Sequence, residues 1–379
     1  MIPGNTPNPS PLTSISPSNA FQLLQCESQV AFSLDKDFQK YNKKTPRTVL
    51  GSAFHNFVEA VYKNRGITED DLDTLWQKQI DKAEDELAES WYPRKPSKPS
   101  AWPGFKKKRR YAKRKAKTII QSRLPAQNNN TQIGNEPDRL SSETKKREYN
   151  FPLPAIGEPL SEQWLKVPDD HISGKVDLIE CYDEGKYSII DIKTGAFINA
   201  EEIEDKHQSQ LFLYAYMFFK IKKFWPTKLE IETSESLRYQ VNFTTEQVIH
   251  HVEDLISSRE AFNIKAENRS LDFVATPSRF NCQWCIYKVV CSSFWEAYTK
   301  DWYDEKTAMC GRIKISDEGF EILEIHSPRE RKGDVIPLPT GAPEGLRKEH
   351  HEWLMVTDFE SIDGLGNLKP GPITKYAYF

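Results

Sequence analysis

The sequence has no apolar run long enough to cross a membrane, because no stretch of about 18 uncharged apolar residues occurs in it. Its first 19 residues, MIPGNTPNPSPLTSISPSN, have neither the basic start nor the apolar centre of a secretion signal. We therefore expect a soluble, cytoplasmic protein with no membrane partner. At 379 residues, of which 38% are apolar, the chain is long enough for one large or two ordinary domains with a core.

The chain also has no marked excess of one charge, since its formal net charge is -3. The total charge therefore gives no argument for a nucleic-acid partner. The distribution is uneven: residues 94–123 contain no Asp or Glu, whereas the preceding residues 67–90 are acidic. A run of like charges this dense needs solvent or a polyanion around it, so a solvated surface and a DNA contact are both open.

Cysteine is scarce, and without a secretion signal the six cysteines argue against a disulfide framework. Cys282, Cys285 and Cys291 form a C-x2-C-x5-C pattern, and Cys26 can supply the fourth thiolate of a four-coordinate site. The spacing alone leaves Zn²⁺ and an iron–sulfur cluster open. We expect the remaining two, Cys181 and Cys310, to be ordinary buried or free thiols.

The spacing of apolar residues predicts an α/β core. Helices are expected over 19–38, 49–66, 204–224 and 245–263, and strands over 148–153, 171–182 and 186–195, with two more within 228–244. Residues 183–185, Asp-Glu-Gly, predict a hairpin turn, and 125–146 an exposed loop. The last 75 or so residues alternate in short segments and predict a small all-β domain, with an oligonucleotide-binding (OB) barrel as the candidate architecture.

Two charges stand in an otherwise apolar strand, IIDIKTG, at residues 189–195. Asp191 and Lys193 are two residues apart and project to the same face of the strand. Across the predicted hairpin, Asp177 is placed to lie beside them. An ordinary ion pair is one explanation. The other is a divalent cation, because two close carboxylates repel each other and Mg²⁺ or Mn²⁺ accepts carboxylate and carbonyl oxygens.

Beside such a cation, a lysine can orient or activate a water against a phosphodiester. Two helical pairs are compatible with this chemistry: Gly51 with His55, and Gln210 with Tyr214, each one turn apart. A neutral imidazole can bind a metal, and a Gln/Tyr pair can hold the substrate or the lysine. Taken alone, each pair is also explained by packing or by surface exposure.

Taken in order, His55, the G-x-x-D motif ending at Asp177, the D-x-K motif and the Q-x-x-x-Y motif resemble the RecB-like branch of the PD-(D/E)XK nuclease superfamily. The resemblance covers roughly residues 26–291. It implies a restriction-endonuclease-like core with a mixed sheet flanked by helices. The implied metal ligands are His55, Asp177, Asp191 and the backbone carbonyl of Ile192; the implied catalytic residues are Lys193, Asp191, Asp177, Gln210 and Tyr214. Asp191 stands where many relatives have Glu, which the superfamily accepts.

The cysteines carry a second resemblance. A distant N-terminal Cys combined with a C-terminal C-x2-C-x5-C is similar to the iron–sulfur nucleases, including the AddB nuclease domain and the CRISPR-adaptation exonucleases. This implies a structural 4Fe-4S cluster on Cys26, Cys282, Cys285 and Cys291, with Zn²⁺ as the alternative. The expected domains are a flexible N-terminal arm (1–18), a nuclease domain (19–300) with a basic helical insertion at about 66–146, and a small β domain (301–379).

The resemblance implies a Mg²⁺- or Mn²⁺-dependent deoxyribonuclease, and a single-strand-preferring exonuclease in DNA recombination, repair or defence against foreign DNA. Its partner would be DNA that is single-stranded or has free ends. DNA contacts are expected at Lys106, Lys107, Arg109, Arg110, Tyr111, Lys113 and Arg114, with Trp102, Phe105 and Tyr111 stacking on bases. No G-x-x-x-x-G-K-[ST] loop occurs, so unwinding would need a separate helicase or defence-complex partner. The alternative is a non-catalytic DNA-binding or scaffold subunit.

Overall fold

A computed structural model describes residues 6–42, 44–90, 98–123, 151–194, 198–199, 202–203, 205–233, 235–270, 272–302, 307–315, 317, 321–337, 353–359, 361–362, 368–369 and 375–378. The chain divides into two compact units. The first spans residues 1–13, 22–45 and 257–379, and the second spans 14–21 and 46–256. The loop predicted over 125–146 and the start of the basic segment, 94–97, lie outside the described residues.

The second unit is built on a five-stranded mixed sheet in the order β1-β2-β3-β6-β7. Its strands are β1 (Leu160–Val167), β2 (Ile172–Asp183), β3 (Lys186–Lys193), β6 (Lys228–Thr233) and β7 (Arg238–Val241). Neighbouring strands are antiparallel except β3 and β6, which are parallel. The predicted turn between β2 and β3 is present, and Gly185 in it adopts a φ of 68° that favours glycine. This sheet and its flanking helices confirm the predicted α/β fold class.

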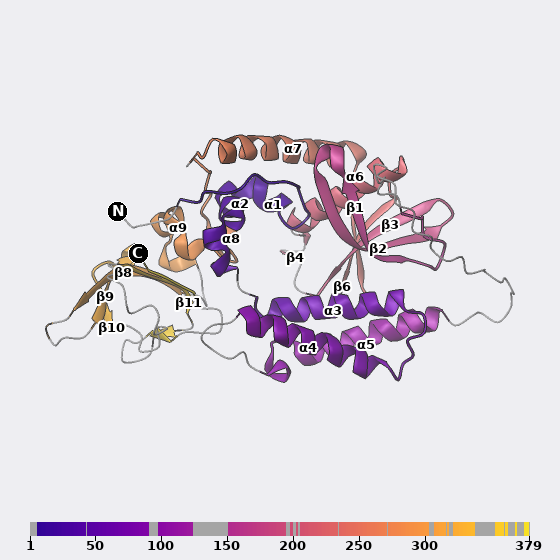
Figure 1. Ribbon diagram of the computed structural model, residues 1–379, viewed down its shortest axis with the longest axis horizontal. Helices are drawn as coiled ribbons and strands as arrows, with labels where there is room; N and C mark the ends of the chain where they lie inside the picture. The colour runs from indigo at the N-terminus through magenta and orange to yellow at the C-terminus, as the bar shows by residue number, and fades with distance from the viewer. Residues whose placement is uncertain are drawn as a thin grey trace, which may run out of the picture. The chain divides into compact units, whose positions relative to one another are not determined.

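Helix α6 (Asp205–Lys222) makes the crossover between the parallel strands β3 and β6 (Figure 1). Its apolar residues Leu211, Leu213 and Phe218 are buried in one cluster with Ile189 of β3 and Leu229 of β6. Packing of this helix on the sheet therefore fixes the position of its first three turns, which carry the Q-x-x-x-Y motif.

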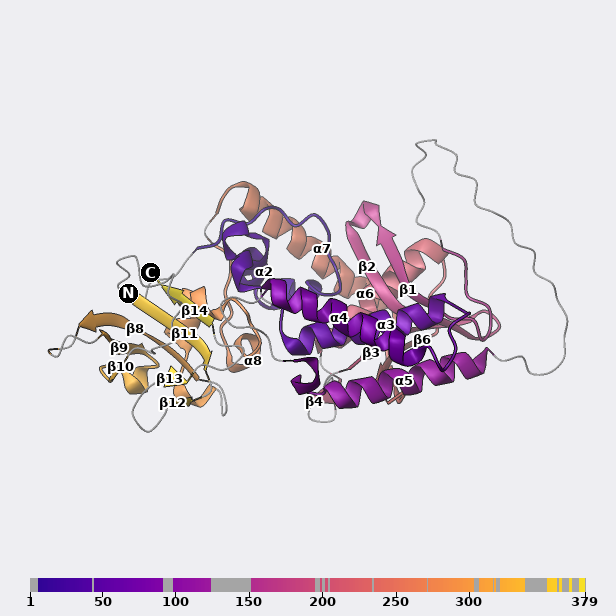
Figure 2. The same ribbon diagram turned by 60° about the horizontal axis from the view of Figure 1, so that its bottom comes forward.

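Three further helices form a layer of the second unit: α3 (Pro46–Lys63), α4 (Leu72–Ser90) and α5 (Phe105–Ser122). They lie side by side in both views (Figures 1 and 2). Phe57, Trp76 and Ala112 are among the buried residues that they share, and Ile192 of β3 belongs to the same cluster. The residue between Asp191 and Lys193 therefore packs on this helical layer, while the charged pair points to the opposite face.

The basic helix α5 is matched by the acidic segment before and within α4. Arg109 Nη2 and Lys113 Nζ pair with the Asp73 carboxylate at 2.7 and 2.8 Å, and Lys117 Nζ pairs with Glu69 at 2.5 Å. Exposed pairs of this kind each contribute little stability. They nevertheless explain part of the basic run by a neighbour within the same fold.

The prediction that Trp102 and Tyr111 stack on bases is wrong, because their side chains are only 2% and 5% exposed. Trp102 packs in the helical cluster, and the Tyr111 hydroxyl donates a hydrogen bond to the Glu235 carboxylate. Phe105 is half-buried against the same cluster. These aromatic side chains hold α5 on the helical layer.

Lys115 is the basic residue of α5 on which folding is expected to depend most. Its ammonium is buried and pairs with Glu232 of β6, which Arg238 of β7 also contacts at 3.2 Å. Lys115→Met removes one of the two cations from a buried carboxylate and should lower the free energy of unfolding by about 3 kcal/mol. Chemical denaturation measures the loss, with Lys117→Met, which breaks an exposed pair, as the matched control. Equal losses in the two variants would contradict the prediction.

The first unit contains a second five-stranded sheet, which is antiparallel and ordered β10-β9-β8-β11-β14. Its strands are β8 (Thr307–Ile315), β9 (Glu321–Ser327), β10 (Val335–Pro337), β11 (Trp353–Phe359) and β14 (Lys375–Tyr378). The predicted C-terminal β region is therefore confirmed. The OB barrel stays a prediction, because the described strands form an open sheet with β10 and β14 at its edges.

The remaining elements are short, except for α7 (Thr245–Glu267). The others are α1 (Ala20–Gln25), α2 (Glu27–Leu34), α8 (Arg279–Cys282), α9 (Ser292–Ala297), β4 (Ile198–Asn199), β5 (Glu202–Ile203), β12 (Ser361–Ile362) and β13 (Leu368–Lys369). Helix α7 is capped by Thr244, whose hydroxyl accepts a hydrogen bond from the backbone N–H of Gln247. No helix in the described part of the chain has the length and apolarity that a membrane span requires.

The N-terminal segment differs from the flexible arm expected over 1–18. Ile15 is fully buried and forms a parallel bridge with Ile172 of β2. In the other unit, Leu12 is buried and its backbone N–H donates to the Asn263 side chain at 2.7 Å. Single apolar residues between the prolines and serines thus anchor this segment by burial. Its overall polar composition therefore gave the wrong prediction of a flexible arm for these residues.

Candidate active site

The ladder between strands β2 and β3 ends just before Asp177 and Asp191. The ladder runs up the hairpin to Leu178, which pairs with Ile190. Beyond that pair, the Asp177 carboxylate takes the place of a backbone partner, since its Oδ2 accepts the N–H of Ile192 at 2.6 Å. Asp177 and Asp191 are thus brought to the same end of the sheet, as the hairpin spacing predicts.

Gly174 of the G-x-x-D motif has a packing role. A Cβ atom at this position would lie 2.8 Å from the Pro17 ring and 3.1 Å from the Tyr214 ring. The first distance is shorter than real Cβ contacts allow, so a side chain would force the backbone apart. Glycine therefore allows β2 to approach α6 closely, three residues before Asp177.

On the α6 face, Asp191, Lys193, Gln210 and Tyr214 form a continuous network. Lys193 Nζ lies 2.7 Å from Asp191 Oδ2 and donates to Gln210 Oε1 at 2.8 Å. The Gln210 amide in turn donates to Asp191 Oδ1 at 2.8 Å. The Tyr214 hydroxyl lies 3.4 Å from the same amide and donates to the Lys175 backbone carbonyl at 2.7 Å. One glutamine thus fixes the relative positions of a carboxylate and an ammonium.

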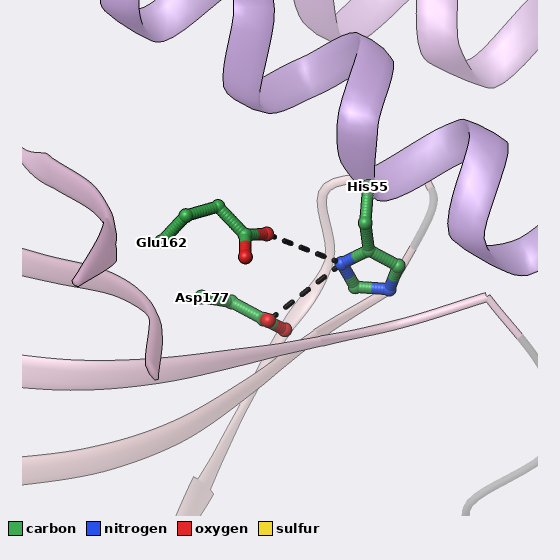
Figure 3. Close-up of side chains that lie close together, drawn as sticks. All are labelled: His55, Glu162 and Asp177. Carbon is green, nitrogen blue, oxygen red and sulfur yellow. Dashed lines mark ion pairs between the residues drawn. The ribbon is translucent and has the colours of Figure 1, made fainter. Parts of the chain in front are cut away.

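His55, Glu162 and Asp177 meet next to this network (Figure 3). His55 Nδ1 lies 3.8 Å from Glu162 Oε1 and 3.6 Å from Asp177 Oδ1. These distances are too long for good hydrogen bonds. Among the described residues, these three form the group of potential metal ligands whose ligand atoms all lie within 4.8 Å of one another.

Sequence reasoning missed Glu162. It lies on β1 between Ser161, which pairs with Leu178, and Gln163, which pairs with Val176, so it stands opposite Asp177. Its φ of 53° is unusual for a residue within a strand. Lys175 Nζ contacts its Oε2 at 2.6 Å. No motif marks this position, because only the β1–β2 register brings it to the site.

The charges at this site shift one another's pKa values. Burial raises the pKa of Asp177 to about 6, an effect that His55 opposes and that Asp191 and Glu162 increase. Burial lowers the pKa of His55, but the carboxylates of Asp177 and Glu162 outweigh burial and the net pKa is raised. Burial also raises the pKa of Glu162, but His55 and Lys175 outweigh it and the pKa is lowered. Carboxylates crowded in this way are stabilised by a cation.

The donor set fits a hard divalent cation. Asp191 Oδ2 is buried and forms an ion pair with Lys193 Nζ at 2.7 Å. Asp191, Asp177 and Glu162 bring three carboxylates close together, and a divalent cation would offset their mutual repulsion. The His55 imidazole and the carboxylates of Asp177, Asp191 and Glu162 are ligands that suit Mg²⁺ or Mn²⁺.

The four cysteines predicted to share a metal centre line one cavity of the first unit: Cys26, Cys282, Cys285 and Cys291. Burial raises the pKa of Cys282 and of Cys285 to about 12 and that of Cys291 to about 11. Of these described cysteines, no three have sulfurs within 4.8 Å of one another. Tetrahedral Zn²⁺, with Zn–S bonds of about 2.3 Å, holds its sulfurs about 3.8 Å apart. The spacing is therefore wider than a single zinc ion requires.

The basic residues expected to bind DNA fall into two groups. Arg109 and Lys113 pair with Asp73, and Lys107 Nζ lies 3.7 Å from Glu235. Lys106, Arg110 and Arg114 are exposed. The guanidinium groups of Arg110 and Arg114 lie 5.3 and 6.0 Å from the centre of the Tyr111 ring.

A family model described as "PD-(D/E)XK nuclease superfamily" matches residues 14–292 of the chain. No curated protein matches it. Ten chains of solved structures match, among them one titled "Crystal structure of SSO0001", with 22% sequence identity and a TM-score of 0.24. That match covers 36% of this chain and 61% of the other, so this chain spans less than two thirds of that protein's length.

Proposed function

Because this chain belongs to the PD-(D/E)XK nuclease superfamily, we propose that it is a Mg²⁺- or Mn²⁺-dependent nuclease that hydrolyses phosphodiester bonds of DNA. The observation that carries the proposal is the link from Lys193 through Gln210 to Asp191. It places an ammonium and a buried carboxylate beside each other, next to the group formed by His55, Glu162 and Asp177. A scaffold protein has no need to hold the Lys193 ammonium and the Asp191 carboxylate at a fixed distance.

The cation would be held by His55, Asp177, Asp191 and the backbone carbonyl of Ile192. When bound, it would supply Lewis acidity toward a phosphate oxygen and a water. Lys193 then orients or activates that water, and Gln210 keeps its ammonium from rotating away. The Tyr214 hydroxyl accepts a hydrogen bond from the Gln210 amide and donates one to the Lys175 carbonyl of β2, so it holds Gln210 in place. His55 and Asp177 reach the same place from α3 and β2.

Glu162 is a further candidate ligand, because its carboxylate faces His55 and Asp177 from β1. Glu162→Gln should weaken Mn²⁺ binding at least about 10-fold, since it replaces an anionic oxygen donor by a neutral one. Calorimetric titration with Mn²⁺, in the absence of nucleic acid, measures the change. Glu158→Gln is the matched control, because Glu158 is exposed and pairs with Arg65 away from these ligands. Equal Mn²⁺ affinity in both variants would exclude Glu162 as a ligand.

The cysteine cavity is proposed to hold a structural 4Fe-4S cluster. The wide spacing of the sulfur atoms favours a cluster over one Zn²⁺ ion. Because Cys26 is distant in sequence from Cys282, Cys285 and Cys291, a cluster on all four would close a long loop of the chain. Buried thiols with raised pKa values become thiolates only when a metal centre binds them. With this cluster, the chain would lie in the RecB-like iron–sulfur branch of the superfamily, near the AddB nuclease domain and the CRISPR-adaptation exonucleases.

The proposed substrate is DNA that is single-stranded or has free ends, cleaved as by an exonuclease in recombination, repair or defence against foreign DNA. Lys106, Arg110 and Arg114 support it with exposed cations on the surface of α5. A separate helicase or defence complex would supply such ends.

The proposal is tested with anaerobically purified protein and end-labelled single-stranded DNA, duplex DNA and RNA. Cleavage is expected with Mg²⁺ or Mn²⁺, and none with EDTA. The ladder of products over time separates removal of nucleotides from an end from internal cutting. A folded protein that binds DNA but cleaves none of the three substrates with either metal would favour the non-catalytic DNA-binding or scaffold subunit.

A further inference from the structure

Helix α3 carries a row of residues that runs away from the candidate metal site. Arg47, Gly51, His55 and Glu59 follow one another at intervals of four and therefore lie along one face of the helix. His55 is the candidate metal ligand, and Glu59 pairs with Lys175 at 3.3 Å. In the other direction, Gly51 lies one turn from His55, or about 6 Å along the helix axis, and Arg47 lies two turns from it.

Two polar groups meet beside Gly51, the residue of this row that has no side chain. Lys108 of α5 extends its Nζ to the Thr194 hydroxyl at 3.0 Å, and Thr194 directly follows Lys193. A Cβ atom on Gly51 would lie 3.7 Å from that Nζ and 3.9 Å from the Thr194 Oγ1. Both distances are ordinary contacts, so the glycine leaves room beside an ammonium and a hydroxyl.

Lys108 differs from three other basic residues of α5 in having no counter-ion among the described residues. Lys107, Arg109 and Lys113 each have a carboxylate partner, whereas among the described residues Lys108 has none. Lys108 is half-buried, and burial, with a smaller effect of the Arg47 charge, lowers its pKa to about 8. Two cations with no anion between them repel each other, which favours a site that an external anion completes.

We propose that Lys108, Thr194 and Arg47 bind a phosphate of the nucleic acid next to the scissile one, about one helical turn along α3 from His55. This inference rests on the proposed nuclease function, because it takes the candidate metal site as the place of cleavage. The phosphate is either an internal one of the strand or a terminal one. The three groups offer an ammonium, a hydroxyl and a guanidinium, all of which can donate to phosphate oxygens.

Lys108→Met tests the proposal by removing the charge while keeping most of the side chain. The KM for a single-stranded oligonucleotide should rise about 10-fold, as for loss of a hydrogen bond to a charged group. The slope of log affinity against log salt concentration, measured in EDTA, should fall by about 0.7, the contribution of one phosphate contact on a single strand. Lys82→Met, which removes an exposed lysine of α4, is the control and should change neither quantity.

Chemically altered substrates identify the phosphate. A single uncharged methylphosphonate next to the mapped cleavage site should impair binding to the wild type, but it should have little further effect on Lys108→Met if that phosphate is internal. A preference of the wild type for a 5′-phosphate over a 5′-hydroxyl, lost in the variant, would identify a terminal phosphate instead. If the variant keeps the wild-type salt slope and the wild-type sensitivity to both substrates, the inference is overturned.

A second pair of variants covers the case in which Lys108→Met does not fold. Gly51→Asp places a carboxylate beside Lys108, where it competes with phosphate, whereas Gly51→Ala fills the same space without charge. We expect weaker oligonucleotide binding and a lower salt slope for Gly51→Asp than for Gly51→Ala. Equal binding by the two would overturn the inference. Because binding is read in EDTA, a wild type that binds but does not cleave would overturn the nuclease function and leave the phosphate contact measurable.

Discussion

Lys193→Ala is expected to lower the rate of phosphodiester cleavage about 100- to 10,000-fold, the range for removing a positioned acid–base group. The ammonium of Lys193 is held between Asp191 and Gln210, at 2.7 and 2.8 Å, so the substitution removes the cation that contacts both groups. The fold should survive, because Lys193 is at the end of β3 and is not fully buried. DNA binding should therefore change much less than the rate.

Single-turnover cleavage of end-labelled single-stranded DNA with Mg²⁺ or Mn²⁺ measures the effect, with binding followed separately by fluorescence anisotropy. Lys186→Ala is the matched control: it removes a lysine from the other end of the same strand, where the side chain is exposed and pairs with Asp183. Cleavage by this control at the wild-type rate is expected. Wild-type rates in Lys193→Ala itself would assign the cleavage to another site or to a contaminant.

The network around Lys193 was predictable because it depends on short intervals. Residues two apart on a strand and four apart on a helix keep a fixed relation wherever the element lies. The D-x-K spacing therefore already predicted that Asp191 and Lys193 share a face, and the Q-x-x-x-Y spacing that Gln210 and Tyr214 share one. The hairpin turn at Gly185 is also local. What the sequence could not give was the hydrogen bonding that joins these two pairs through Gln210.

Glu162 and Lys108 could not be predicted for the opposite reason. Glu162 reaches the site through the register of β1 against β2, with an unusual φ, and neither is encoded in a nearby motif. Lys108 and Thr194 are 86 residues apart in the chain, and they meet because α5 packs in the cluster that also contains Ile192 of β3. Such residues come from tertiary packing, which composition and periodicity do not determine.

The basic segment shows a limit of composition. Nine residues of α5 are Lys or Arg, and the helix has no acid of its own, which favoured a polyanionic partner. Yet Asp73 and Glu69 form ion pairs with three of these side chains, and Lys115 is buried and pairs with Glu232. A run of basic residues therefore predicts that negative charge lies nearby. It does not show whether that charge comes from the same chain or from a partner.

Cys26→Ala is expected to prevent the proposed metal centre from forming in the first unit and to unfold the residues around the cysteine cavity. Cys26 is the ligand most distant in sequence from the others, so it joins residues 22–45 to the C-terminal part of the unit. The free energy of metal binding appears as free energy of folding, and for structural thiolate sites it is on the order of 10 kcal/mol. Losing one of four ligands should therefore lower the unfolding temperature by much more than an ordinary core substitution.

Iron, acid-labile sulfide and zinc per chain, visible absorbance and thermal unfolding measure the effect in protein purified anaerobically. Cys310→Ala is the matched control, because Cys310 is a buried thiol of the same unit that does not line the cavity. Cys310 is fully buried and Cys26 is not, so the control creates the larger cavity, and any additional loss of stability in Cys26→Ala belongs to the proposed metal centre. Wild-type iron and sulfide in Cys26→Ala would remove Cys26 from the ligand set. Zinc without iron in the wild type would replace the cluster by a zinc site, and the four cysteines would keep their structural role.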